Sequence, residues 1–141
     1  MTATDISAFQ STMQTTTDWL NELAGELGRD DPQQAYRVLR GVLMALRDRL
    51  TVDEATDFGA QLPMLIRGFC YEGWNPNKNP TGERDRQSFR NHVADNLVPA
   101  VDGDPEEATR AVFRVVQKHI TAGEVQDVKS NLPGDIQALW P

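Results

Sequence analysis

Two groups of acidic and hydroxyl side chains have spacings that could support acid–base or metal chemistry. The first group is Thr51, Asp53, Glu54 and Asp57, and the second is Thr121, Glu124 and Asp127. Paired carboxylates can transfer protons or bind a divalent cation. The spacing Thr-x-x-Glu is also that of a capping box, in which the hydroxyl accepts the glutamate N–H and the glutamate returns to the threonine N–H. We favour this structural interpretation, because acids in a first turn also complement the helix dipole.

The segment Asp102-Gly103-Asp104-Pro105-Glu106 begins like a calcium-binding loop. Such a loop needs glycine at its sixth position and glutamate at its twelfth. Glu107 and Phe113 occupy these positions. We therefore expect a helix N-cap with an acidic first turn instead of a calcium site.

The two histidines and the single cysteine show no catalytic or metal-binding signature. Phe89 and Val116 lie three residues before His92 and His119, so neither histidine belongs to the Glu-x-x-His pair of di-metal bundles. We expect both histidines at the surface or at helix ends. Cys70 has no nucleophile motif around it and is expected to be a small buried hydrophobe. No catalytic, cofactor-binding or metal-ligating residue is predicted.

Aromatic and arginine side chains gather around residues 72–84, which form a predicted connector. Large aromatics next to arginine often anchor a partner protein. The candidate interaction surface comprises Tyr71, Trp74, Arg84, Arg86 and Arg90. The competing interpretation is a structural latch, in which Tyr71 and Trp74 hold the connector onto the helices, since large aromatics usually bury most of their area.

Apolar periodicity predicts the helices that must position these residues. A first helix is expected to end at Gly28, and its apolar stripe is Ile6, Phe9, Met13, Thr16, Leu20, Leu23 and Leu27. Asp31 and Pro32 are expected to open a central buried helix whose arginines, Arg37, Arg40, Arg47 and Arg49, lie mostly off its apolar stripe.

A thirteen-residue signature occurs twice, seventy positions apart. Thr51, Glu54, Asp57, Leu62 and Pro63 recur as Thr121, Glu124, Asp127, Leu132 and Pro133. Self-similarity at a fixed spacing indicates that one supersecondary unit was used twice. We therefore predict one all-α domain over residues 1–141, a compact bundle of about seven to eight helices. Unit one spans about 5–71, the connector 72–84 and unit two about 85–141.

Several of these segments resemble a known bacterial family. The matching stretches are Ala35-Tyr36, Leu46-Arg47-Asp48-Arg49-Leu50-Thr51, Ala60-Gln61-Leu62-Pro63-Met64-Leu65-Ile66-Arg67-Gly68, Tyr71-Glu72-Gly73-Trp74 and the closing Leu139-Trp140. They are similar to the family called domain of unknown function 2267. The resemblance implies a small helical bacterial protein and transfers no activity. Cys70 departs from it, because a tyrosine is expected there.

Charge and composition narrow the function further. The formal net charge is −7, which argues against nucleic-acid binding, since such proteins usually carry a basic footprint. No apolar run approaches the roughly 20 residues that span a bilayer, and the acidic first helix argues against membrane binding. The single cysteine and the absence of a secretory pattern favour a cytoplasmic protein.

The sequence is compatible with two functions from different classes. The first is a non-enzymatic interaction or accessory module, such as an adaptor or stress-related protein, which binds another protein or itself. The alternative is a small-ligand or metal-dependent activity in a cleft between the two helical units, lined by Cys70, His92 or the acids.

Overall fold

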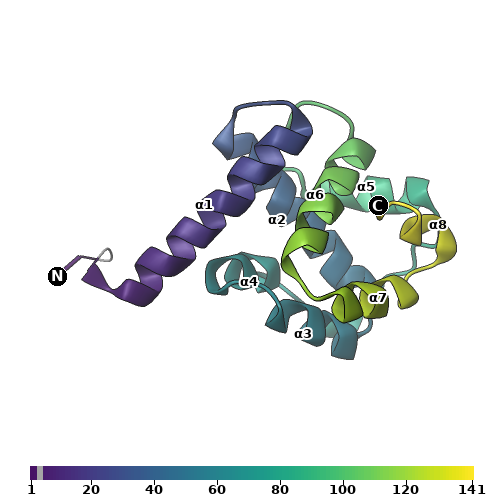
Figure 1. Cartoon of the computed structure of the whole chain (residues 1–141). Coiled ribbons are helices and arrows are strands. Elements are labelled where there is room, and N and C mark those ends of the chain that lie inside the picture. Colours follow the sequence, from purple (N-terminus) through teal and green to yellow (C-terminus); the bar gives the residue numbers. More distant parts are fainter. Residues whose placement is uncertain (3–4) are drawn as a thin grey trace.

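The computed structural model describes residues 1–2 and 5–141. The only regular secondary structure among these residues is helical, so the predicted all-α class is confirmed within them (Figure 1). The α-helices are α1 (Ser7–Leu27), α2 (Pro32–Arg49), α3 (Val52–Ala60), α4 (Met64–Tyr71), α5 (Arg86–Asn96), α6 (Pro105–His119), α7 (Ala122–Ser130) and α8 (Gly134–Gln137). A short 3-10 helix, η2 (Pro76–Lys78), lies in the connector.

Helix α2 is the central helix of the bundle. The Asp31 side chain accepts the backbone N–H groups of Gln33 and Gln34, and Pro32 needs no partner at the first position. The helix contacts α1, α3, α4, α5 and α6. Its apolar side chains at Ala35 and from Val38 to Leu46 are buried, which confirms the predicted central buried helix.

Helix α1 runs without a break and ends at Gly28. This glycine has φ +68°, a left-handed conformation that an L side chain rarely adopts. The C-terminal half of α1 packs on α2 and α6, with Trp19 and Leu23 buried. The N-terminal half extends beyond the bundle (Figure 1). The apolar stripe is therefore not covered along its whole length.

Two arginines of α2 are buried, which differs from the prediction. Arg47 Nη1 donates to the carbonyl oxygens of Cys70 at 2.8 Å and Glu72 at 3.0 Å. Arg49 Nε donates to the carbonyl oxygen of Glu83 at 2.6 Å. Both guanidinium groups are thus buried with polar partners that lie in the last turn of α4 or in the connector. Helical spacing could not reveal these partners, because they are distant in sequence.

Both capping boxes form in one direction only. The Thr51 and Thr121 hydroxyls accept the N–H groups of Glu54 at 3.2 Å and Glu124 at 3.1 Å. The return bond does not form at Thr121, whose N–H donates to Gln61 Oε1 at 3.3 Å. Oε1 of each glutamate is buried without a hydrogen-bond partner. The expected return of the glutamate to the threonine N–H is therefore absent from both capping boxes.

The starts of α3 and α7 exchange similar contacts. Thr51 Oγ1 donates to Asn131 Oδ1 at 3.1 Å, while Thr121 N donates to Gln61 Oε1. Thr51 and Thr121 are seventy positions apart, and so are Gln61 and Asn131. The N-terminus of each short helix thus forms a hydrogen bond with the residue that ends the short helix of the other unit, as in a two-fold interface. This reciprocity agrees with two related units, although the duplication itself stays a prediction.

Candidate functional site

The connector is fastened to the end of α2 by one asparagine. Asn79 Nδ2 donates to the carbonyl oxygens of Arg47 at 2.6 Å and Leu50 at 2.9 Å. Its Oδ1 accepts the indole N–H of Trp74 at 2.8 Å. Asn79 therefore pairs carbonyl groups that the helix end leaves free and holds Trp74 at the same time.

The two aromatic residues of the predicted interaction surface stack on each other. The rings of Tyr71 and Trp74 lie 5.3 Å apart and are inclined by 13°. The Tyr71 hydroxyl lies 3.3 Å from the carbonyl oxygens of Ala55 and Thr56, and burial raises the pKa of Tyr71. These internal contacts favour the latch interpretation for this pair.

The three arginines of the same surface differ in their contacts. Arg86 pairs with Asp135 at 3.4 Å and Arg90 pairs with Asp104 at 2.9 Å. Arg84 is exposed, and no hydrogen bond or ion pair joins it to another described residue. The structure therefore leaves Arg84 as the cation of this surface most open to a partner.

His92 lies between two carboxylates, contrary to the expectation of a simple surface or helix-terminal position. Its Nδ1 bonds Glu83 of the connector, and its Nε2 lies 3.3 Å from Asp48 Oδ2 of α2. Asp48 Oδ1 also accepts from Arg47 Nε at 2.9 Å. Sequence spacing could not reveal this cluster, because its members come from α2, the connector and α5.

The charges of this cluster support one another. The hydrogen bond to Asp48, followed by that to Glu83, raises the pKa of His92. Burial works to raise the pKa values of Asp48 and Glu83, but the hydrogen bonds from His92, together with Arg47 at Asp48 and Thr81 at Glu83, hold both pKa values below their ordinary range. Both ring nitrogens are engaged by carboxylates, so the imidazolium form is favoured. The cluster fastens the connector to α2 and α5.

His119 also joins two helices. Its Nε2 lies 2.8 Å from Glu22 Oε2, and its ring stacks on Trp19 at 4.6 Å. The histidine is the last residue of α6, whereas both partners belong to α1. The predicted position at a helix end is therefore confirmed, and the histidine additionally fastens α1 to α6.

Cys70 is buried, which confirms the prediction of a small hydrophobe. Its Sγ lies 3.8 Å from the carbonyl oxygen of Leu43. Burial raises the pKa of Cys70 to about 12. Because the thiolate is the reactive form, this thiol is a poor nucleophile in the folded protein.

Two glutamate carboxyls meet where α3 packs on α7. Glu54 and Glu124 are each 9 % exposed. Burial, followed by the hydrogen bond and the charge of Glu54, raises the pKa of Glu124 to about 8. Among residues 1–2 and 5–141, no three His, Cys, Asp or Glu side chains come together as a metal site. Because its pKa is raised to about 8, Glu124 keeps its proton at neutral pH.

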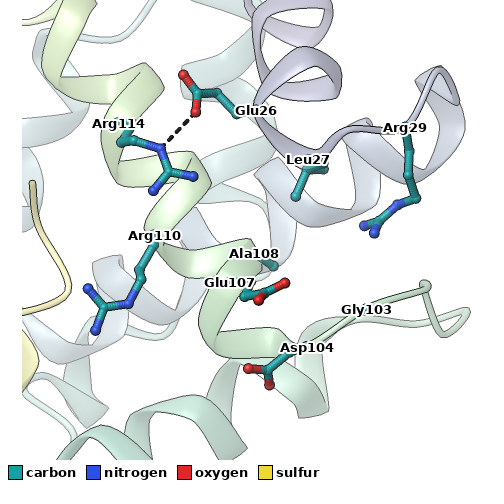
Figure 2. A pocket seen from close by; sticks show the side chains of 9 residues that line it. All are labelled: Glu26, Leu27, Arg29, Gly103, Asp104, Glu107, Ala108, Arg110 and Arg114. Atoms are coloured by element: carbon teal, nitrogen blue, oxygen red, sulfur yellow. Dashed lines mark hydrogen bonds and ion pairs between the residues drawn. The ribbon is translucent and has the colours of Figure 1, made fainter.

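A polar cleft lies between the end of α1 and the N-terminal part of α6 (Figure 2). Its volume is about 400 Å³, and we call it the α1–α6 cleft. The lining residues are Glu26, Leu27, Arg29, Gly103, Asp104, Glu107, Ala108, Arg110 and Arg114. It lies between the two predicted units, as the alternative function requires. Cys70, His92 and the paired glutamates do not line it, whereas Asp104, one of the acids considered above, does.

A second concavity, the α1–α4 groove, lies beside the protruding part of α1. Its volume is about 320 Å³, and it is lined by Ala8, Ser11, Thr12, Thr15, Pro63 and Met64. The backbone N–H of Leu65 donates to Thr12 Oγ1 at 3.0 Å and fixes the start of α4 against α1. The sequence did not indicate this groove, because α1 and α4 are far apart along the chain.

These features define a small all-α protein in which α1 lines concave surfaces against both α4 and α6. The model of the family described as "Uncharacterized conserved protein (DUF2267)" matches residues 16–139. The chain therefore belongs to this family, as its sequence resemblance implied. No curated protein matches the chain. Within the described residues, no helix combines the length and apolarity needed to cross a membrane.

Proposed function

We propose that this protein is a non-enzymatic interaction module that binds a helix of a partner protein in the α1–α4 groove. The observation that carries the proposal is a set of exposed apolar side chains on the two helices that border the groove, of which Met64 also lines it. Phe9 and Met13 of α1 are 42 % and 49 % exposed, and Met64 and Leu65 of α4 are 54 % and 44 % exposed. Exposed apolar side chains that gather in one place mark interaction sites more often than isolated ones do.

The shape of the groove suits a helix. On the α1 side its lining residues, such as Ala8 and Thr12, are small. A partner helix can therefore approach the α1 backbone, as in the helix-in-groove mode of recognition. Met64 provides a flexible side chain that adapts to the surface it meets.

Charge complementarity indicates the chemistry of the partner. Helix α1 contains no lysine or arginine over Ser7–Leu27, and the exposed carboxylates of Asp5 and Asp18 flank its protruding part. The whole chain carries a net charge of −7. The partner is thus an amphipathic helix whose apolar face is flanked by Lys or Arg, because like charges across an interface are unfavourable. A second copy of this acidic chain fits less well.

Site-specific crosslinking in cells tests this proposal. A photo-crosslinking amino acid replaces Gln10, which is exposed on α1, in the full chain. We expect a crosslink to another protein, at a segment with apolar residues three and four apart and flanking Lys or Arg. The double change Phe9→Ser and Met13→Ser should remove this crosslink without lowering the helix content.

A matched probe at Arg84 separates the groove from the predicted connector surface. If the same photo-crosslinking amino acid captures a partner from position 84 and not from position 10, the groove proposal is wrong. Such a result would support the surface around Tyr71, Trp74, Arg84, Arg86 and Arg90, which stays a separate proposal. A crosslink from position 10 to a second copy of this chain would also contradict the groove proposal.

A second function, small-ligand binding in the α1–α6 cleft, has one observation in its favour. Arg29 Nε is buried without a hydrogen-bond partner at the cleft. A buried donor of this kind costs free energy unless a bound molecule satisfies it. Titration of the full chain with small carboxylates and amines, followed by calorimetry, tests for any ligand. The charged residues that line the cleft indicate the chemical class of that ligand.

A further inference from the structure

The charged side chains of the α1–α6 cleft are mostly paired with one another or with nearby residues. Glu26 accepts from Arg114 at 2.7 Å, as Figure 2 shows, and from Lys118 at 3.4 Å. The hydrogen bond from Arg114 lowers the pKa of Glu26, so this carboxyl is ionised. Asp104 pairs with Arg90. These charged groups are already paired within the protein, so they have few hydrogen-bonding positions available for a ligand.

Arg110 is also engaged within the protein. Its Nε lies 3.4 Å from Glu106 Oε2, one turn earlier on α6. Its Nη1 donates to the carbonyl oxygen of Ala138 at 3.3 Å. Figure 2 shows this side chain turned away from Arg29. It therefore supports the C-terminal segment of the chain.

Two charged side chains at the cleft have no partner within the described part of the chain. The Arg29 guanidinium makes no hydrogen bond or ion pair, and its Nε is buried. The exposed Glu107 carboxylate likewise has none. In Figure 2 both extend toward the same opening, with Leu27 on the α1 side of it and Ala108 beside Glu107 on the α6 side. The cleft thus offers one unpaired cation and one unpaired anion, and Leu27 and Ala108 are among its lining residues.

The wall beside Arg29 is held in place by the loop before α6. Asp102 and Gln34 bond each other twice, from Gln34 Nε2 to Oδ2 at 2.9 Å and from Asp102 N to Oε1 at 3.0 Å. Gly103 has φ +92°, and a Cβ there would lie 2.9 Å from Arg29 Nη1. The positive φ favours glycine at this position, and the absence of a side chain lets the guanidinium of Arg29 lie close to the backbone there.

We propose that the α1–α6 cleft binds a small zwitterion, with Arg29 holding its carboxylate and Glu107 holding its ammonium group. This inference rests on the second proposed function, small-ligand binding in the same cleft. The guanidinium fork matches a carboxylate in a bidentate manner, and a carboxylate accepts from an ammonium group. A volume of about 400 Å³ holds on the order of a dozen water-sized groups, which suits a free amino acid.

Calorimetric titration of the full chain with ω-amino acids of increasing length tests the proposal. The probes are glycine, 4-aminobutyrate and 6-aminohexanoate, and the monofunctional controls are butyrate and butylammonium. We expect one zwitterion to bind at least tenfold more tightly than either control. Arg29→Gln and Glu107→Gln should each weaken that binding at least tenfold, and Arg29→Lys should weaken it less than Arg29→Gln.

The matched control is Lys78→Gln, which changes an exposed lysine that lines none of the cleft and should leave binding unchanged. Circular dichroism verifies that each variant keeps its helices. Butyrate could bind as tightly as every zwitterion, and its binding could be lost in Arg29→Gln but not in Glu107→Gln. That result would contradict the zwitterion proposal and would still support ligand binding in the cleft. Binding of no probe would contradict both, as expected if Arg29 and Glu107 simply pair across the opening.

Discussion

The carboxyl groups of Glu54 and Glu124 meet where α3 packs on α7, and one oxygen of each is buried without a hydrogen-bond partner. Each glutamate is the third residue of a helix whose first turn is capped by a threonine. The pair is therefore placed by two local motifs, but its proximity is a property of the packed bundle. Two like charges this close favour the form in which one carboxyl keeps its proton.

Replacing Glu124 by Gln should stabilise the protein at alkaline pH. Burial and Glu54 raise the pKa of Glu124 from 4.5 to about 8. The associated stability is complete below pH 4.5 and is lost as pH rises through about 8. At pH 8.5 we expect a gain of roughly 1–2 kcal/mol, which raises Tm by about 3–6 °C. Thermal unfolding at pH 5 and pH 8.5 checks this.

The matched control for that prediction is Asp53→Asn, in the same first turn as Glu54 but exposed. It should change Tm similarly at both pH values. A Glu124→Gln variant whose Tm follows that of the wild type across the whole pH range would show that the two carboxyls do not interact.

Replacing His92 by Gln should destabilise the protein most near pH 6. Asp48 and Glu83 raise the pKa of His92, so its contribution is complete below pH 6.5 and is lost as pH rises through the raised value. The contribution of the two carboxylates, whose pKa values are lowered, is complete above pH 4.5 and is lost as pH falls through those lowered values. We expect a loss of about 1–3 kcal/mol near pH 6, as for hydrogen bonds to charged groups, and a smaller loss at pH 9.

Urea unfolding at pH 6 and pH 9 measures this difference. Gln87→Ala, an exposed change on the same helix, serves as the control and should have no pH-dependent effect. Equal losses for His92→Gln at the two pH values would mean that the histidine contributes packing and not charge.

Replacing Gly59 by Ala should destabilise the protein because Tyr71 occupies the space beside it. A Cβ at position 59 would lie 1.8 Å from Tyr71 Oη and 2.3 Å from Cζ. The ring would have to leave its contacts with Ala55 and Thr56, and overpacking of this kind costs about 1–3 kcal/mol. Gly68→Ala, on α4 with no atom within 4 Å, should instead gain up to about 1 kcal/mol. Chemical unfolding of both variants provides the comparison, and equal stabilities would contradict this close contact.

Cys70 should be unreactive in the folded protein. Burial raises its pKa to about 12, and its side chain is enclosed beside α2. A thiol reagent at pH 8 should therefore modify it only through unfolding, at a rate that follows the unfolding equilibrium. Absorbance of the released thiolate of the reagent, with and without urea, measures this. Rapid modification of the native protein would indicate that the α2–α4 contact opens locally.

The helices could be predicted because their signals are local. Gly28 ends α1, Asp31 with Pro32 opens α2, and Thr51 and Thr121 cap α3 and α7. Each signal acts on backbone groups within about four residues, so neighbouring positions in the chain are sufficient to reveal it. The central position of α2 followed equally from its broad apolar face.

The candidate sites could be predicted only in part. The connector residues Tyr71 and Trp74 were expected to contact the bundle or a partner, and the structure shows their stacking and the Asn79 contact. No sequence pattern linked Arg29 to Glu107, or His92 to Asp48 and Glu83. The apolar spacing of α1 also gave no indication that Phe9 and Met13 would be exposed while Leu23 is buried.

By itself, the sequence determined where the helices start and end, which faces are apolar, and that one signature occurs twice. The tertiary structure decided which polar groups meet: Glu54 with Glu124, His92 with two carboxylates, and Arg29 and Glu107 at one cleft. The physical reason is the distance along the chain over which each interaction acts. Capping and periodicity depend on neighbours along the chain. The protonation state of a side chain, and whether its donors and acceptors find hydrogen-bond partners, depend instead on distant residues that packing brings within a few ångströms.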